Sequence, residues 1–171
     1  MKNRSFAVAS LVAMLAAAPA LADDNNNTAN IDQIGVNLTA SATQTGAGNT
    51  SVANIDQGLS VAGDGLAATI NQHALDNDHE AHIIQDGTTQ NADIDQGGAD
   101  SENYALIDQE GTNNMASILQ NGTNNTNSVE VYQVGGGVLN TVTVDQGGTD
   151  STNAAGVSQN GNNLTASIVQ N

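Results

Sequence analysis

Residues 109–120 read Gln109-Glu-Gly-Thr-Asn-Asn-Met-Ala-Ser-Ile-Leu-Gln120 and hold one period of a pattern that runs through most of the chain. Ile118 stands two positions before Gln120, Ala116 stands four before it, and Asn114 stands six before it. A spacing of two places these side chains on one face of an extended strand. Gly111 follows the preceding glutamine by two positions and suits a tight turn, because glycine tolerates positive φ. The stretch therefore predicts a strand with an Asn-Ala-Ile-Gln inner face.

The same unit recurs along the chain with spacings of 11 to 15 residues between its glutamines. The repeated glutamines are Gln33, Gln44, Gln57, Gln72, Gln85, Gln96, Gln109, Gln120, Gln133, Gln146, Gln159 and Gln170. The asparagines six positions before a glutamine are Asn27, Asn103, Asn114, Asn127, Asn140 and Asn153. The glycines two positions after a glutamine are Gly35, Gly46, Gly87, Gly98, Gly111, Gly122, Gly135, Gly148 and Gly161. Ala or Val stands four positions before every one of these glutamines.

Strands of this kind, paired as strand-turn-strand units, predict an all-β solenoid in which two parallel sheets are stacked. We expect six rungs, at about residues 27–50, 51–78, 79–102, 103–126, 127–152 and 153–171. An inward-facing amide that has no hydrogen-bond partner costs roughly a few kcal/mol of folding free energy. Rungs about 4.8 Å apart would remove that cost, because each amide could bond to the identical amide above and below. The sequence therefore predicts amide ladders and makes stacking obligatory.

The N-terminus has the features of a secretion signal. Lys2 and Arg4 precede an apolar run, and Pro19-Ala-Leu-Ala22 offers small residues at a cleavage site. We expect residues 1–22 to be a signal peptide and residues 23–26 to be a short acidic, Asn-rich leader. The apolar run is shorter than the ~20 residues that a membrane-spanning helix needs. The mature protein is therefore expected to be secreted.

Charge and composition exclude several classes of function. Lys2 and Arg4 are the chain's two basic residues and all 18 acidic residues follow Ala22, so the mature chain has a formal charge of −18. Such a chain cannot neutralise nucleic-acid phosphates and is not attracted to an anionic membrane. It lacks cysteine, and no nucleophile, base and orienting group stand together as catalysis requires. We expect no enzyme activity and no cofactor.

With twelve half-repeats in register from Asn27 to Gln170, the sequence resembles the curlin family. That resemblance implies a homopolymeric, extracellular amyloid fibre (curli) that serves in adhesion and in the biofilm matrix. It implies three further partners: a dedicated outer-membrane secretion channel, its accessory factors and a minor nucleating subunit. The last rung lacks basic residues, whereas the minor subunit tends to carry a basic, divergent last repeat. This chain therefore resembles the major subunit.

Aspartates just before the glutamine alternate to the outer face, and Asp32 and Asp56 should lie above one another in adjacent rungs. Like charges this close raise the carboxyl pKa. The bland interpretation is a solvated acidic face; the sharper hypothesis is that these charges slow assembly until acid or a divalent cation screens them. The residues concerned are Asp32, Asp56, Asp95, Asp108 and Asp145.

Other polar clusters have simpler interpretations. The segments 96–103 and 146–153 share a Gly-Gly-x-Asp-Ser turn, for which calcium capture is the less favoured alternative. His73, His79 and His82 gather near acidic residues, but strand parity directs His79 inward and His82 outward. We therefore expect an ordinary polar region and no metal site.

Two alternative functions remain open: a minor nucleating curlin, and a monomeric β-solenoid that binds calcium or another ligand. Solenoids that remain monomeric usually carry atypical polar terminal repeats. Here the first and last rungs are nearly alike, in residues 35–41 and 161–167. We therefore expect both ends to be open, with Gln33, Gln44, Gln159 and Gln170 at the growing ends.

Overall fold

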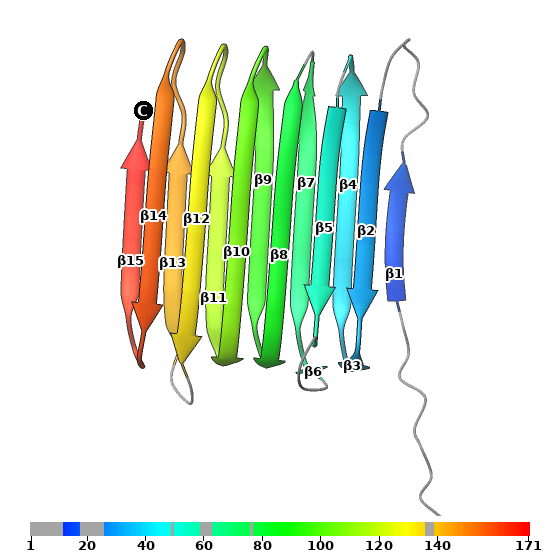
Figure 1. Cartoon of the computed structure of the whole chain (residues 1–171), viewed down its shortest axis with the longest axis vertical. Helices are drawn as coiled ribbons and strands as arrows, with labels where there is room; N and C mark the ends of the chain where they lie inside the picture. The colour runs from blue at the N-terminus through cyan, green and yellow to red at the C-terminus, as the bar shows by residue number, and fades with distance from the viewer. Residues whose placement is uncertain (1–11, 18–25, 49, 59–62, 76, 136–138) are drawn as a thin grey trace, which may run out of the picture.

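The computed structural model describes residues 12–17, 26–48, 50–58, 63–75, 77–135 and 139–171, and Figure 1 shows these as strands joined by short turns. The strands are β1 (Val12–Ala17), β2 (Asn26–Gln33), β3 (Gly35–Val36), β4 (Thr39–Ala47), β5 (Thr50–Gln57), β6 (Gly63–Asp64), β7 (Ala67–Leu75), β8 (Asp78–Thr88), β9 (Asn91–Ala99), β10 (Glu102–Thr112), β11 (Asn114–Gln120), β12 (Thr126–Gly135), β13 (Asn140–Gln146), β14 (Thr152–Asn160) and β15 (Thr165–Gln170).

Successive long strands alternate between two parallel sheets, which lie face to face (Figure 1). Sheet A has the order β1-β4-β7-β9-β11-β13-β15, and the main path of sheet B has the order β14-β12-β10-β8-β5-β2. One strand from each sheet makes a rung, so rung 1 is β2 with β4 and rung 6 is β14 with β15. Over the described residues, the prediction of a six-rung β-solenoid with two stacked parallel sheets is confirmed.

The register is set by the repeat, because each of the twelve repeat glutamines is paired with a repeat glutamine of a neighbouring rung in its sheet. Gln109 on β10, for example, is opposite Gln85 on β8 and Gln133 on β12. A slip of one residue would turn the whole inner face outward. The inner alanine and the branched residue stack in the same way and form a thin core with almost no exposure, as at Ala81, Ile83 and Val144.

A glycine turn position recurs two residues after the glutamine. The predicted glycine takes a positive φ at Gly35, Gly87, Gly111, Gly122 and Gly161. Gly135 departs from that expectation, because its φ lies outside the left-handed region. These glycines also stack closely: a Cβ on Gly111 would overlap the carbonyl oxygen of Gly135. Close approach between rungs therefore excludes a side chain at Gly135 as well, where a Cβ would overlap the carbonyl oxygen of Gly161.

The N-terminal region holds the irregular parts of the fold. Strand β1 pairs in parallel with β4, from Val12 opposite Thr39 to Ala17 opposite Gln44. It lies within the predicted signal peptide, whose remaining residues 1–11 and 18–22 are outside the described residues, as are residues 23–25 of the leader. The two-residue strands β3 and β6 pair with each other beside rung 2.

Candidate self-association site

Two continuous ladders of glutamine amides run the length of the stack. In sheet B, Nε2 of each glutamine donates to Oε1 of the next, at 2.5–3.0 Å from Gln33 through Gln57, Gln85, Gln109 and Gln133 to Gln159. In sheet A the same bonds measure 2.6–3.1 Å from Gln44 through Gln72, Gln96, Gln120 and Gln146 to Gln170. All the bonds point the same way, towards the C-terminal rung.

Every ladder glutamine after Gln33 also bonds to a backbone oxygen across the core. Gln109 Nε2 donates to the backbone oxygen of Asn91 in sheet A at 3.2 Å, and Gln120 Nε2 donates to that of Tyr104 in sheet B at 2.9 Å. An interior amide therefore uses one N–H along the ladder, one N–H across the core, and its oxygen as an acceptor. Because buried amides are costly only when unpaired, these glutamines fix register and sheet spacing together.

The ladders end with opposite chemistry. At the N-terminal end, Gln33 Oε1 is buried and has no hydrogen-bond partner among the described residues. At the C-terminal end, Gln159 and Gln170 each donate one N–H to a backbone oxygen of the facing sheet, at 3.3 Å and 3.2 Å. Within the described stack neither has a following glutamine to receive its second N–H. The glutamine ladders thus leave an acceptor without a donor at the N-terminal end, at Gln33, and amide donors at the C-terminal end.

The asparagine ladder is partial and runs the opposite way. Asn153 donates to Asn127 at 3.1 Å, Asn127 donates to Asn103 at 3.0 Å, and Asn140 donates to Asn114 at 3.1 Å. Asn27 lies at the end of the stack, exposed and opposite Ser51. The six asparagines named from the sequence therefore fall into one run of three, one pair, and the separate Asn27.

His79 interrupts the asparagine column between Ser51 and Asn103. Its side chain faces inward with 2% exposure, and neither ring nitrogen has a partner in the described part of the chain. Burial, with a smaller contribution from His73, lowers the pKa of His79 to about 4. The imidazole is therefore neutral over most of the pH range in which a free histidine titrates.

The other two histidines face solvent. His82 lies 2.8 Å from Glu80 and 3.1 Å from Asn54, and His73 lies 2.8 Å from Asp95. Among the described residues, no cluster of three potential metal ligands forms around them.

The structure contains a third polar column that the sequence pattern did not reveal. Asn77, Ser101, Asn125 and Ser151 stand eight positions before a glutamine, at the corner between the sheets. Ser101 N donates to Asn77 Oδ1 at 2.5 Å, and Ser151 N donates to Asn125 Oδ1 at 3.0 Å. This corner column alternates asparagine with serine and lies outside the seven-residue strand unit, so a search for repeated identical residues misses it.

The left-handed turn residue was also missed, because it varies in type. The residue four positions after a glutamine takes a φ of 51–58° at Asn37, Thr89, Asp100, Asn113, Asn124, Asp150 and Asn163. Asparagine and aspartate tolerate that conformation better than most residues. A preference for these two types at one offset was the available signal.

The aspartates named from the sequence line the outer faces. Asp32 pairs with Asp56 in register on sheet B. Burial first, and then the charge of Asp32, raise the pKa of Asp56. Burial and the carboxylates of Glu110 and Asp86 raise the pKa of Asp108 in the same sheet. Asp95 and Asp145 lie on sheet A, where burial and then Asp95 raise the pKa of Asp93.

Comparison with known proteins agrees with this geometry. The model of the curlin-associated repeat matches residues 101–135, which span β10, β11 and β12. Neither a curated protein nor a solved structure matches the chain significantly. No helix that could cross a membrane occurs among the described residues. The fold and the ladders define a stacked-repeat β-solenoid, and the matched repeat makes the chain similar to proteins of the curlin family.

Proposed function

We propose that the mature chain is a secreted structural subunit that assembles with copies of itself into an extracellular amyloid fibre of the curli type. The observation that carries this proposal is the complementary chemistry of the two ends of the stack. Gln33 offers a buried acceptor with no donor among the described residues, while Gln159 has an N–H left over. A polar group buried without a partner is costly, and a second copy of the chain supplies the partner.

The ladder directions support one way for two copies to meet. Rung 6 of one subunit lies against rung 1 of the next, so Gln159 donates to Gln33 and Gln170 donates to Gln44. The asparagine ladder points the other way, and Asn27 then donates to Asn153. Head-to-head packing would place donors against donors. We therefore propose a polar fibre in which both kinds of ladder continue through each junction.

The other columns are also compatible at this junction. Partly buried Ile168 would cover Ala42, and Leu164 would stack on Leu38. On the outer face Asp32 would lie beside Ser158, so no second carboxylate opposes it. Stacking of columns at the junction thus completes the dry core without pairing like charges.

Export is part of the proposal, because β1 occupies the N-terminal edge of sheet A in the full chain. Removal of residues 1–22 as a signal peptide would expose β4, and β2 already forms the N-terminal edge of sheet B. An open edge strand is a template for pairing with another chain. By family resemblance, a dedicated outer-membrane channel and its accessory factors deliver the chain, a minor subunit nucleates it, and the fibres serve in adhesion and the biofilm matrix.

The chain fits the major subunit better than the minor one, because rung 6 continues both glutamine ladders and has no basic residue. A structural role also fits the curlin repeat and the solenoid, so we propose no enzymatic reaction.

The test is seeded elongation of the chain that starts at Asp23, followed by thioflavin fluorescence. We expect Gln33→Ala to slow elongation about tenfold, because the loss of a ladder bond at the docking end weakens each addition event. The matched control is Gln109→Ala, which removes the same group from the interior. Equal slowing by both variants, or greater slowing by Gln109→Ala, would contradict docking through the ends. A wild-type chain that stays monomeric when seeded would instead support the ligand-binding solenoid.

A further inference from the structure

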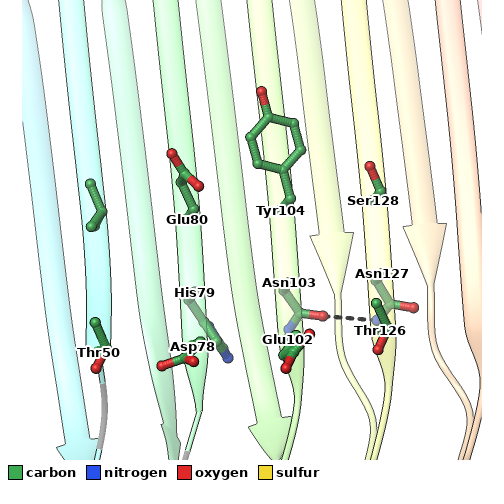
Figure 2. Close-up of a pocket in the computed structure, with 11 residues that line it drawn as sticks. Thr50, Asp78, His79, Glu80, Glu102, Asn103, Tyr104, Thr126, Asn127 and Ser128 are labelled. Carbon is green, nitrogen blue, oxygen red and sulfur yellow. Dashed lines mark hydrogen bonds between the residues drawn. The ribbon is translucent and has the colours of Figure 1, made fainter.

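A groove of about 480 Å³ crosses the outer face of sheet B over β5, β8, β10 and β12. Figure 2 shows two rows of side chains along its sides. One row holds Thr50, Asp78, Glu102 and Thr126, which are in register on neighbouring strands, and the other holds Val52, Glu80, Tyr104 and Ser128. Glu80 and Tyr104 extend away from Asp78 and Glu102 (Figure 2). The inward-facing residues His79, Asn103 and Asn127 lie between the two rows and also line the groove.

The groove combines negative charge with an aromatic wall. Asp78, Glu80 and Glu102 are all exposed, and Asp78 and Glu102 are register partners on adjacent strands. Among the described residues, His82 is the single basic side chain that pairs with a carboxylate of the groove, through Glu80 at 2.8 Å. Because the mature chain has no lysine or arginine, the charges of Asp78 and Glu102 are open to a cation from another molecule.

Tyr104 lies within the field of these charges. Burial raises the pKa of its hydroxyl, and the nearby Glu130 and Glu80 raise it further. The ring centroid lies 6.2 Å from that of His82, at an interplanar angle of 46°. An aromatic ring held among carboxylates attracts an organic cation through both its face and its neighbours.

We propose that this groove binds an extended, arginine-bearing peptide segment of a partner protein. Arginine fits better than lysine, because its planar guanidinium can stack on an aromatic ring and can donate two hydrogen bonds to one carboxylate. Four strands about 4.8 Å apart give a groove roughly 14 Å long, which matches four to five extended residues at ~3.3 Å each. A metal ion is a poorer occupant, because the described residues hold no cluster of three potential ligands there.

The groove lies within one chain, so the proposal does not depend on polymerisation. Its position on the outer face leaves both ends of the stack free. In a fibre the groove would recur once per six rungs, or roughly every 29 Å at ~4.8 Å per rung. A partner with several basic segments would then bind a fibre much more tightly than a single subunit.

The test measures the binding of a fluorescein-labelled hexapeptide, Thr-Arg-Thr-Arg-Thr-Arg, to the mature chain by fluorescence anisotropy at low salt. We expect the double variant Glu80→Gln/Glu102→Gln to weaken binding about tenfold and Tyr104→Leu to weaken it about threefold. The charge-matched control is Asp93→Asn/Asp145→Asn, which removes two carboxylates from the outer face of sheet A and should change the Kd less than twofold.

Two results would overturn the proposal. An equal loss of affinity in the control variant would show diffuse attraction to a −18 chain, and unchanged binding in the groove variants would place the peptide elsewhere. The same hexapeptide with citrulline, the neutral analogue, in place of arginine measures the affinity that remains without the positive charge. Circular dichroism of each variant establishes that the sheets are intact, which is expected because all the replaced groups are on outer faces.

Discussion

The two halves of the stack share a backbone but differ in how well their buried polar groups are satisfied. In rungs 4–6 the inner column of sheet B is Asn103, Asn127 and Asn153, bonded in series. In rungs 1–3 the same column is Asn27, Ser51 and His79, and no such series forms among the described residues. The buried polar atoms without a partner in the described chain belong to Gln33, His79 and Gln90, all in rungs 1–3.

The comparison shows that a ladder stabilises a rung only where the neighbouring rung repeats the same group. Apart from the end of the ladder at Gln33, the pairing of the long strands and the glutamine ladders are the same in both halves. The difference therefore lies in the inner columns six positions before the glutamines. We therefore expect rungs 4–6 to be the more stable half and rungs 1–3 to open first.

The largest effect should follow Gly111→Ala in the better-satisfied half. The new Cβ would overlap the carbonyl oxygen of Gly135 on the next rung, and φ at this position is 102°. We expect a loss of several kcal/mol, ~3 or more, since backbone strain and a clash act together. The control is Gly156→Ala, where nothing lies within 4 Å of the added Cβ. The measurement is urea unfolding of the monomer, and equal midpoints for the two variants would contradict the stacking of glycines between rungs.

The asparagine column gives the next effect. Asn127→Ala removes a residue that donates to Asn103 and accepts from Asn153, so the buried Asn103 loses its donor and the partly buried Asn153 loses one acceptor. We expect a loss of roughly 1–3 kcal/mol. Asn27→Ala, at the exposed end of the same column, should cost the monomer less than about 0.5 kcal/mol. Unfolding curves of the two variants that coincide would remove the contrast between the halves.

His79→Asn should repair the column in the weaker half and change its response to acid. The pKa of about 4 in the fold lies below the ordinary histidine value of 6.5, so the stability linked to His79 is full above pH 6.5 and falls as the pH drops towards 4. A shift of this size corresponds to on the order of 3 kcal/mol. Asp78 and His73 are the charged neighbours, with opposite effects on the histidine.

We expect the asparagine variant to be at least as stable as the wild type at pH 7 and clearly more stable at pH 4.5, as measured by urea unfolding at both values. The conservative control is His82→Asn, since His82 is solvent-facing and pairs with Glu80. The same acid sensitivity in the His79→Asn variant as in the wild type would place the acid-labile point outside rung 3.

The stacked aspartates of rungs 1 and 2 predict the opposite dependence on pH. The pKa of Asp56 is raised, so its contribution to stability is present at low pH and is lost as the pH rises through the folded-state pKa. Asp56→Asn should therefore speed elongation at pH 8 in calcium-free buffer, with a gain that shrinks as the pH falls. Seeded thioflavin kinetics at pH 8 and pH 5 measure this. An increase in elongation rate of the same size at both pH values would contradict the hypothesis that these charges slow assembly.

The smallest effect concerns a single turn. Thr89 has a φ of 54°, whereas asparagine or aspartate occupies the same turn position in the other rungs that adopt this φ. Thr89→Asn should stabilise the monomer by roughly 0.5–1 kcal/mol, because a β-branched residue is strained in this region. Asn113→Thr is the reverse test in rung 4 and should cost a similar amount. A loss of stability in Thr89→Asn would count against this interpretation of the turns.

Much of the fold could be predicted because the repeat encodes it locally. The period of two fixed the inner face, the recurring glutamine fixed the register, and glycine marked the turns. The direction of the ladders could not be predicted, because a side-chain amide can donate to the rung above or to the rung below. The direction depends on which N–H bonds to the facing backbone, as that of Gln109 does to the Asn91 oxygen. The corner column was not predicted, because its members Asn77 and Ser101 are different residue types. The sequence shows His79 as a departure from the asparagine pattern. That its two ring nitrogens have no partner among the described residues is visible only in the three-dimensional structure.

The most direct test of stacked amide ladders as the basis of a fibre is X-ray diffraction from aligned assemblies of the mature chain, grown near neutral pH. The account predicts fibres with a meridional reflection near 4.7 Å and an equatorial reflection near 10 Å, the spacings between strands and between sheets. A chain that remains a soluble monomer for weeks, even when seeded, or fibres without the 4.7 Å reflection, would contradict it.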